Sequence, residues 1–218
     1  ALIISIKSYK LSKNEEDLLA NKNPWGLILF KRNIKSLDQI KKLIKKIRKV
    51  TNDSKFPILI DEEGKKVSRL GEIINHEVSQ KLFGDLYKTH PKISQKLYKN
   101  YINKLCKIFK EIGININTVP VLDVIRQSTS KIIGERSFSD KPNIVKKLGK
   151  ICVNQYKINK IATVIKHIPG HGCASLDSHI KLPKVKLSYK DLKSTDFKPF
   201  MLSSSLFAMT AHILYQNV

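Results

Sequence analysis

The sequence predicts an α/β protein, a (β/α)8 barrel of the TIM type of which about the first six βα units are present. Short apolar, β-branched runs alternate with segments of helical periodicity, the pattern of parallel strands joined by helices. Polar residues recur directly after these runs, and they are Asn33, Asp61, Asp123, Lys166 with His167, and His212. Barrels gather functional side chains at this end of their strands. An open, doubly wound sheet is the alternative, although no Gly-x-Gly-x-x-Gly or phosphate-loop sequence supports nucleotide binding.

Strands are expected at the apolar runs that cover residues 2–6, 26–30, 57–60, 114–119, 161–165 and 207–211. A closed barrel of this kind has eight strands. An arc of six would leave an apolar edge unpaired, which is a liability in a parallel sheet. We therefore expect residues 1–218 to form a single barrel domain that is incomplete at its C-terminus, or whose gap is covered by something else.

The first helices carry recognisable start signals. Ser12 stands three residues before Glu15, which is a capping-box pattern. Ser36 can cap the next helix, whose apolar residues recur at helical spacing over residues 37–50. The stretch from residue 65 to about residue 91 is expected to be a long, irregular insertion.

Later helices are expected from periodicity and from proline and glycine signals. One should end at Gly113, because apolar residues recur before it at Ile93, Leu97, Tyr101, Leu105, Ile108 and Ile112. Pro142 opens another helix, with one face made of Val145, Leu148, Cys152 and Tyr156. A short helix, interrupted near Pro199, is expected between residues 188 and 202.

Composition excludes several classes of protein. Apolar residues make up 41% of the chain, which suits a globular core, and no run of about 18 apolar residues predicts a membrane span. The net charge is +23, but only five of the 41 basic residues are arginine. Arginine is the residue that specific nucleic-acid recognition favours. We expect a lysine-coated, solvated surface and no nucleic-acid partner.

Cysteine usage bears on the compartment. The three cysteines, Cys106, Cys152 and Cys173, show no paired or metal-type spacing, and their odd number argues against a disulfide framework. The apolar run at residues 2–6 is too short for a signal peptide and has no basic lead. These observations favour the cytoplasm. Cys173 lies among polar residues, where a nucleophile is conceivable, but a small filler residue fits as well.

A dense polar cluster lies between residues 165 and 179, where three of the six histidines fall together with a lysine and an aspartate. Pro169 and Gly170 separate His167 from His171, so a helical pair of metal ligands is disfavoured. Asp177 stands two residues before His179. A carboxylate at that distance can accept the imidazole Nδ1–H and raise its basicity, which is an acid/base arrangement. Histidines that merely pack the loop are the alternative.

These residues carry a family resemblance. The string Lys166-His167-Ile-Pro-Gly-His171-Gly172, followed by Asp177-Ser-His179, resembles the signature of family-three glycoside hydrolases, and most closely that of bacterial β-N-acetylglucosaminidases of cell-wall recycling. The likeness spans essentially the whole chain, including residues 26–33 and 209–212.

The resemblance implies roles for individual residues. His179 would be the proton donor and acceptor, oriented by Asp177 and carried on a mobile loop that closes over the sugar. The substrate would be bound by Asp61, Arg69, Arg136, Lys166 and His167. For the two arginines, a structural ion pair with a nearby carboxylate is the alternative. Asp123 is expected to be a structural loop acid rather than a ligand.

Two features depart from the family pattern. Lys65 and Lys66 stand where the family usually has a glycine and an arginine. The family's nucleophilic aspartate follows the seventh strand in a Ser/Thr-Asp-Asp segment, and residues 1–218 contain no such segment. This chain alone is therefore expected to lack the covalent step.

The expected function is that of a retaining exo-β-N-acetylglucosaminidase, which removes terminal N-acetylglucosamine from peptidoglycan-derived glycans such as muropeptides. A monomer that needs neither metal nor cofactor is expected. A β-glucosidase-type member of the family is one alternative, and a catalytically inactive sugar-binding or anion-binding domain is another. Metal-dependent hydrolysis would have to use His167, His171, Asp177 and His179.

Overall fold

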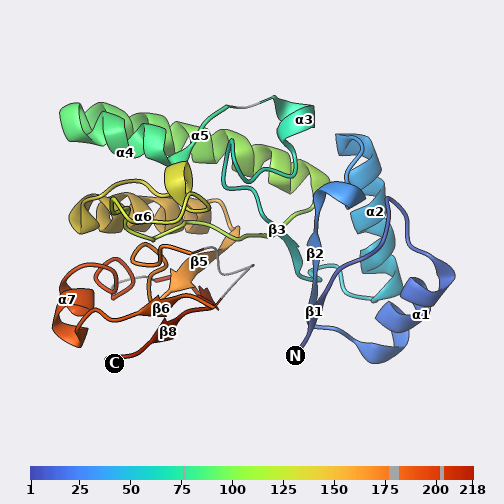
Figure 1. Ribbon diagram of the computed structural model, residues 1–218. Helices are drawn as coiled ribbons and strands as arrows, with labels where there is room; N and C mark the ends of the chain where they lie inside the picture. The colour runs from blue at the N-terminus through green and yellow to red at the C-terminus, as the bar shows by residue number, and fades with distance from the viewer. Residues whose placement is uncertain (76, 177–181, 202–203) are drawn as a thin grey trace.

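Parallel strands form the central sheet, in the order β1-β2-β3-β4-β5-β7 (Figure 1). The computed structural model describes residues 1–75, 77–176, 182–201 and 204–218. Each strand of the sheet pairs in parallel with its neighbours in this order. The strands are β1 (Ile3–Ile4), β2 (Gly26–Leu29), β3 (Ile58–Ile60), β4 (Ile116–Asn117), β5 (Ala162–Ile168) and β7 (Phe207–Thr210).

The sheet is curled into a half-barrel, as the alternating strands and helices predicted. The ring of Trp25, just before β2, lies edge to face with that of Phe207 on β7, and the ring centroids are 5.3 Å apart. Inside the curl, Leu59, Ile116 and Val164 form a small buried cluster. The neighbours of Leu59 in β3 point outward into the main core, as the two-residue period of a strand requires.

Helices surround the sheet, most of them on its outer side (Figure 1). They are α1 (Lys13–Lys22), α2 (Leu37–Val50), α3 (Gly71–Ile74), α4 (Gln80–Thr89), α5 (Pro91–Ile112), α6 (Pro142–Ile158) and α7 (Tyr189–Ser194). The expected inner face of α6 is confirmed, because Val145, Leu148, Cys152 and Tyr156 are all buried. The large cluster between helices and strands is the hydrophobic core.

The helix start and stop signals are confirmed. Ser12 and Glu15 form the reciprocal capping box at the start of α1. Ser36 accepts a hydrogen bond from the backbone N–H of Gln39 at the start of α2. Gly113 ends α5 with φ of 96°, a left-handed conformation that glycine adopts without steric cost.

The stretch at residues 65–91 differs from the irregular insertion that was expected, because it contains α3 and α4. The inward face of α4 carries Gln80, Phe83 and Gly84, of which two lack a large apolar side chain. A Cβ on Gly84 would lie 1.6 Å from the carbonyl oxygen of Phe138, so the helix approaches that backbone too closely for any side chain. The apolar residues Leu82, Phe83, Leu86 and Tyr87 recur at helical spacing, so the sequence does carry a periodic signal for α4.

The face of α5 also differs at its N-terminal end. Ile93 and Leu97 are exposed, whereas Ser94 and Tyr98 are buried. Ser94 donates a hydrogen bond to the carbonyl oxygen of Phe83 at 2.7 Å, and the rings of Tyr98 and Phe83 have centroids 4.5 Å apart. This half of α5 therefore packs against α4, and contact with a neighbouring helix sets its orientation.

Some elements are shorter than expected, and others were missed. The strand expected at residues 114–119 is regular only over β4, and the helix expected at 188–202 is α7 alone. A second sheet pairs β6 (Lys184–Val185) with β8 (Leu214–Tyr215) in parallel, beside the C-terminus in Figure 1. Strands of two residues are too short for a two-residue period to reveal.

Candidate functional site

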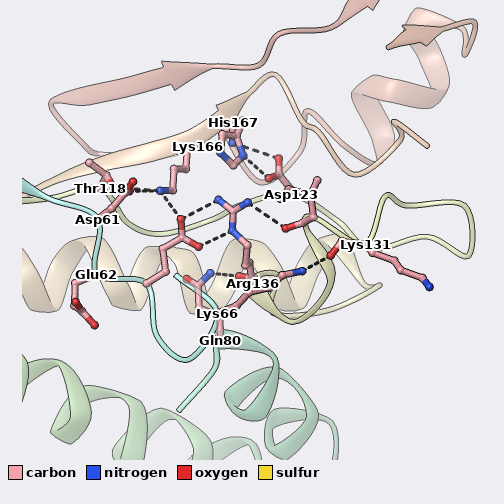
Figure 2. A network of polar contacts seen from close by, with 12 residues as sticks. Asp61, Glu62, Lys66, Gln80, Thr118, Asp123, Lys131, Arg136, Lys166 and His167 are labelled. Atoms are coloured by element: carbon pink, nitrogen blue, oxygen red, sulfur yellow. Dashed lines mark hydrogen bonds and ion pairs between the residues drawn. The ribbon is translucent and has the colours of Figure 1, made fainter. Parts of the chain in front are cut away.

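Lys166 is the centre of a polar network at the carboxyl ends of β3, β4 and β5 (Figure 2). Its Nζ atom lies 2.8 Å from Asp61 Oδ1, 3.1 Å from Thr118 Oγ1 and 2.5 Å from Glu63 Oε1. The Lys166 side chain is 2% exposed. Three acceptors therefore surround an ammonium group that has three hydrogens to donate. The sequence predicted Asp61 and Lys166 as neighbours in a site, and the structure brings them together.

Glu63 joins the second predicted cation to the network. Arg136 donates to it through two nitrogens, Nε to Oε2 at 2.7 Å and Nη2 to Oε1 at 2.9 Å, the bidentate geometry that arginine forms with carboxylates. Arg136 lies in the short helix η2 (Gly134–Arg136). The ion pair that was the alternative for Arg136 is thus present, and it is shared with Lys166 within one network.

The carboxylates of this network are held ionised. Burial by itself would raise the pKa of Asp61, but the Lys166 ammonium overcomes it and the pKa lies well below the usual range. In Glu63 the same burial is outweighed by Lys166 and Arg136, so its pKa is also lowered. The pKa of Arg136 is raised, because Glu63 outweighs the effect of burial. The site therefore presents compensated charges near neutral pH.

Arg69 reaches the same network from the segment that follows Gly64. Its Nη2 atom lies 3.1 Å from Asp61 Oδ2. Its backbone N–H and that of Leu70 both donate to Glu62 Oε2 at 2.8 Å. Figure 2 shows Glu62 pointing away from Lys166. Glu62 thus holds the backbone that presents Arg69, while Asp61 accepts from its side chain.

His167 is bound by Asp123. The two side chains are joined between Nδ1 of the imidazole and Oδ2 of the carboxylate at 2.7 Å. Asp123 Oδ1 also accepts from the backbone N–H groups of His167 at 3.2 Å and of His171 at 2.7 Å. Asp123 is fully buried. These contacts fit the expectation that Asp123 is a structural loop acid.

The polar loop after β5 packs tightly where it begins. A Cβ on Gly172 would lie 1.9 Å from the carbonyl oxygen of Val124, and one on Gly170 would lie 2.8 Å from Asp196 Cβ. Close packing therefore accounts for both glycines. Asp177 and His179, the predicted acid/base pair, lie outside the described residues.

Cys173 is a thiol rather than a thiolate in this loop. Burial, together with the nearby carboxylate of Asp196, raises its pKa to about 12. The Sγ atom donates to the carbonyl oxygen of Gly170 at 3.6 Å. A nucleophilic cysteine needs a lowered pKa, so the geometry favours the filler role.

Other polar residues near strand ends belong to the framework. Asn33 is buried and donates to the carbonyl oxygens of Ile6 and Ser8. His212 is exposed beyond β7. Lys65 pairs with Glu77 at 3.0 Å, and Lys66 donates to the Lys131 carbonyl, so neither enters the contacts of Lys166.

Sequence reasoning missed Glu63 and Thr118. Glu63 carries a usable signal, because residues two apart in an extended chain share one face, and Glu63 stands two after Asp61. Thr118 offers none, since a threonine after an apolar run is common in any strand. Across the described ranges, no three His, Cys, Asp or Glu side chains are grouped so that they could hold a metal ion. No helix there is both long and apolar enough to cross a bilayer.

Comparison with known proteins agrees with this architecture. The β-hexosaminidase of Idiomarina loihiensis is 32% identical over 220 residues, covering 100% of this chain and 65% of the relative. β-Hexosaminidase A of Pseudoalteromonas piscicida is 32% identical over 209 residues, covering 91% of this chain and 34% of the relative. The crystal structure of native NagZ from Neisseria gonorrhoeae superposes with a TM-score of 0.92 at 27% identity, covering 100% of this chain and 64% of that one.

The chain thus spans between about one third and two thirds of the length of these relatives. The model of the glycosyl hydrolase family 3 N-terminal domain matches residues 2–218. The chain, with its half-barrel and its strand-end cluster of charges, therefore belongs to glycosyl hydrolase family 3, of which it represents the N-terminal domain.

Proposed function

We propose that this chain supplies the sugar-binding and acid/base parts of a retaining exo-β-N-acetylglucosaminidase that removes terminal N-acetylglucosamine from peptidoglycan-derived glycans in the cytoplasm. The observation that carries the proposal is the network of Asp61, Lys166, Glu63 and Arg136 at the carboxyl ends of the strands. The relatives named above as β-hexosaminidases support the reaction class.

The network suits a neutral, hydroxyl-rich ligand. Asp61 and Arg69 are its accessible members, with side chains 18% and 25% exposed. In this proposal the Asp61 carboxylate accepts hydrogen bonds from sugar hydroxyls, and Arg69 donates to them. Lys166 keeps Asp61 ionised and in place, since its own three hydrogens already face three acceptors.

Arg136 and His167 complete the proposed subsite. Arg136 uses Nε and Nη2 on Glu63, and Nη1 donates to the Ile132 carbonyl oxygen at 3.2 Å. One N–H on each terminal nitrogen is left over from these contacts. These two hydrogens are the ones that we assign to the sugar.

The acid/base step is assigned to the loop that follows β5. His179 protonates the glycosidic oxygen in this proposal, and Asp177 orients its imidazole. The described start of the loop supports this, because Asp123 binds the His171 backbone beside the network. Retaining hydrolysis also needs a carboxylate nucleophile. We assign it to an aspartate outside residues 1–218.

Turnover of chromogenic glycosides by the full-length protein tests the proposal. p-Nitrophenol should be released from the β-N-acetylglucosaminide and not from the β-glucoside. Proton NMR of the first product should show the β-anomer, as retention requires. Release from the β-glucoside alone would assign the protein to a glucosidase class, and binding of N-acetylglucosamine without any release would leave only a sugar-binding domain.

The role of His179 is tested separately. His179→Ala should lower kcat strongly for a natural disaccharide and less for p-nitrophenyl glycosides, whose leaving group needs little protonation. Asp177→Asn should act in the same direction. Unchanged turnover of both substrates by His179→Ala would remove the histidine from the mechanism.

A further inference from the structure

The carboxylate of Asp123 makes two separate kinds of contact. Its Oδ1 atom accepts from two backbone N–H groups, those of His167 at 3.2 Å and His171 at 2.7 Å. Its Oδ2 atom faces a side chain, the Nδ1 of His167, at 2.7 Å. Oδ1 therefore holds the backbone of the turn through hydrogen bonds, while Oδ2 is hydrogen-bonded to the imidazole ring.

The protonation state of Asp123 follows from its surroundings. Burial would raise the pKa of this carboxyl group, but the imidazole of His167 and the backbone N–H groups overcome that effect, and the pKa is lowered. The guanidinium of Arg136 also acts on it electrostatically. An ionised carboxylate can only accept hydrogen bonds. The 2.7 Å contact with His167 therefore requires a hydrogen on Nδ1.

We propose that Asp123 is a positioning residue that holds the imidazole of His167 with its proton on Nδ1, so that Nε2 is left as a hydrogen-bond acceptor for a sugar hydroxyl. Among the described residues, Nε2 of His167 has no hydrogen-bond partner, and the side chain is 15% exposed. This role rests on the proposed sugar-binding function. It goes beyond that function by giving the direction of one hydrogen bond to the substrate.

An isosteric substitution separates the effect of Asp123 on the backbone from its effect on the tautomer of His167. In Asp123→Asn, the position of Oδ1 faces two N–H donors, so the amide oxygen must take that place. The amide NH2 group then faces Nδ1 of His167. Two donors cannot share one hydrogen bond, so the ring proton moves to Nε2. The variant therefore keeps the hydrogen bonds to the backbone and changes the tautomer of the His167 imidazole.

Nitrogen NMR of the full-length protein with 15N-labelled histidine measures directly which nitrogen of His167 carries the proton. The spectra are recorded at about pH 8.5, and a neutral imidazole gives distinct signals for its protonated and its bare nitrogen. The His167 signals are assigned by their loss in His167→Gln. We expect Nδ1 protonated and Nε2 bare in the native protein, and the reverse in Asp123→Asn. Asp140→Asn, the same change at an exposed site, should leave the His167 signals unchanged.

The native spectrum decides the proposal even where Asp123→Asn does not fold. A native ring with its proton on Nε2, or on both nitrogens at this pH, would overturn it. So would an Asp123→Asn protein that is folded and keeps the native tautomer. These outcomes are independent of turnover, and an inactive native enzyme would instead count against the proposed function.

Steady-state kinetics tests whether Nε2 of His167 accepts a hydrogen bond from the substrate. A reversed imidazole donates where the native ring accepts, so Asp123→Asn should raise KM for the p-nitrophenyl N-acetylglucosaminide about three- to tenfold, on the scale of one hydrogen bond. The value of kcat should change less than KM. A reversed tautomer with an unchanged KM would show that Nε2 accepts no substrate hydroxyl.

Discussion

Glu63 and Arg136 form a bidentate ion pair in which both side chains are almost fully buried, with Nε to Oε2 at 2.7 Å and Nη2 to Oε1 at 2.9 Å. They come from segments 73 residues apart in the chain. The pair thus fastens the segment after β3 to the short helix η2. Replacing either residue by a neutral one would leave the other as an uncompensated charge in the interior. The free energy of unfolding should therefore be sensitive to this contact.

Glu63→Gln should destabilise the fold. Removing one member of a buried ion pair leaves the other uncompensated, which costs about 3–5 kcal/mol. Lys166 would lose an acceptor at the same time. Urea denaturation measures the change in unfolding free energy. Glu72→Gln is the matched control, because its pair with Lys31 is exposed and should be worth ~0–1 kcal/mol. Equal losses in both variants would contradict this account.

The protein should lose stability in mild acid, because three largely buried carboxylates take up protons when it unfolds. The pKa values of Asp61, Glu63 and Asp123 are all lowered in the folded state. The unfolded chain takes up these protons first, at a pH of about 4. Stability is therefore present above that pH and is lost as pH falls toward the folded pKa values. The melting temperature should drop between about pH 5 and pH 3, and the drop should be smaller in Asp61→Asn. A level profile over that range would refute the prediction.

Gly172→Ala should disturb the loop that carries the proposed acid/base pair. The new methyl group would meet the Val124 carbonyl oxygen at 1.9 Å, so the loop or its neighbour must shift. Overpacking of this kind costs about 1–3 kcal/mol. Thermal melting reports the stability change, and kcat of the full-length enzyme reports any displacement of the loop. Ser175→Ala, at an exposed position of the same loop, should change neither.

Cys173 should be chemically inert. Its pKa of about 12 leaves almost no thiolate at pH 8. The native protein should react with a disulfide reagent at this position much more slowly than the urea-unfolded chain does. Cys173→Ala should retain turnover in the full-length enzyme. Rapid labelling of native Cys173, together with loss of turnover in Cys173→Ala, would indicate a nucleophilic cysteine.

The parts of the fold that the sequence predicted are those where one local signal dominates. The capping residues Ser12 and Ser36 and the stop at Gly113 act within a few residues of themselves, so the local pattern suffices. The helix α4 was not predicted, although Leu82, Phe83, Leu86 and Tyr87 recur in it at helical spacing. The packing of its Gly84 against the Phe138 backbone joins segments distant in the chain, and the sequence alone does not show that contact.

The site divides in a similar way. Asp61 and Lys166 each follow or end a buried apolar run, which predicts that they lie at the same end of the sheet, and the structure brings them together. Their role in substrate binding stays what the family resemblance implies. Glu63, which pairs with Lys166 and Arg136, was missed although its place two residues after Asp61 is a usable signal. Its pairing with Arg136, 73 residues away, needed coordinates. Asp123 was expected to be a structural loop acid, and its contacts with His167 and the His171 backbone fit that expectation. Its particular link to the His167 ring needed coordinates, because proximity between two loops is set by the curl of the sheet.

The alternation of Glu62 and Glu63 has a consequence for how this stretch tolerates change. Glu63 turns to the cations, and Glu62 turns to the backbone of Arg69 and Leu70. One residue inserted after Asp61 would exchange the two orientations, so that Glu62 would face the cations and Glu63 would move away from them. The carboxylate that holds the backbone of Arg69 and Leu70 would then be displaced. The adjacent glutamates therefore allow a carboxylate to face Lys166 and Arg136 after a single-codon insertion, whereas the position of the Arg69 side chain would change.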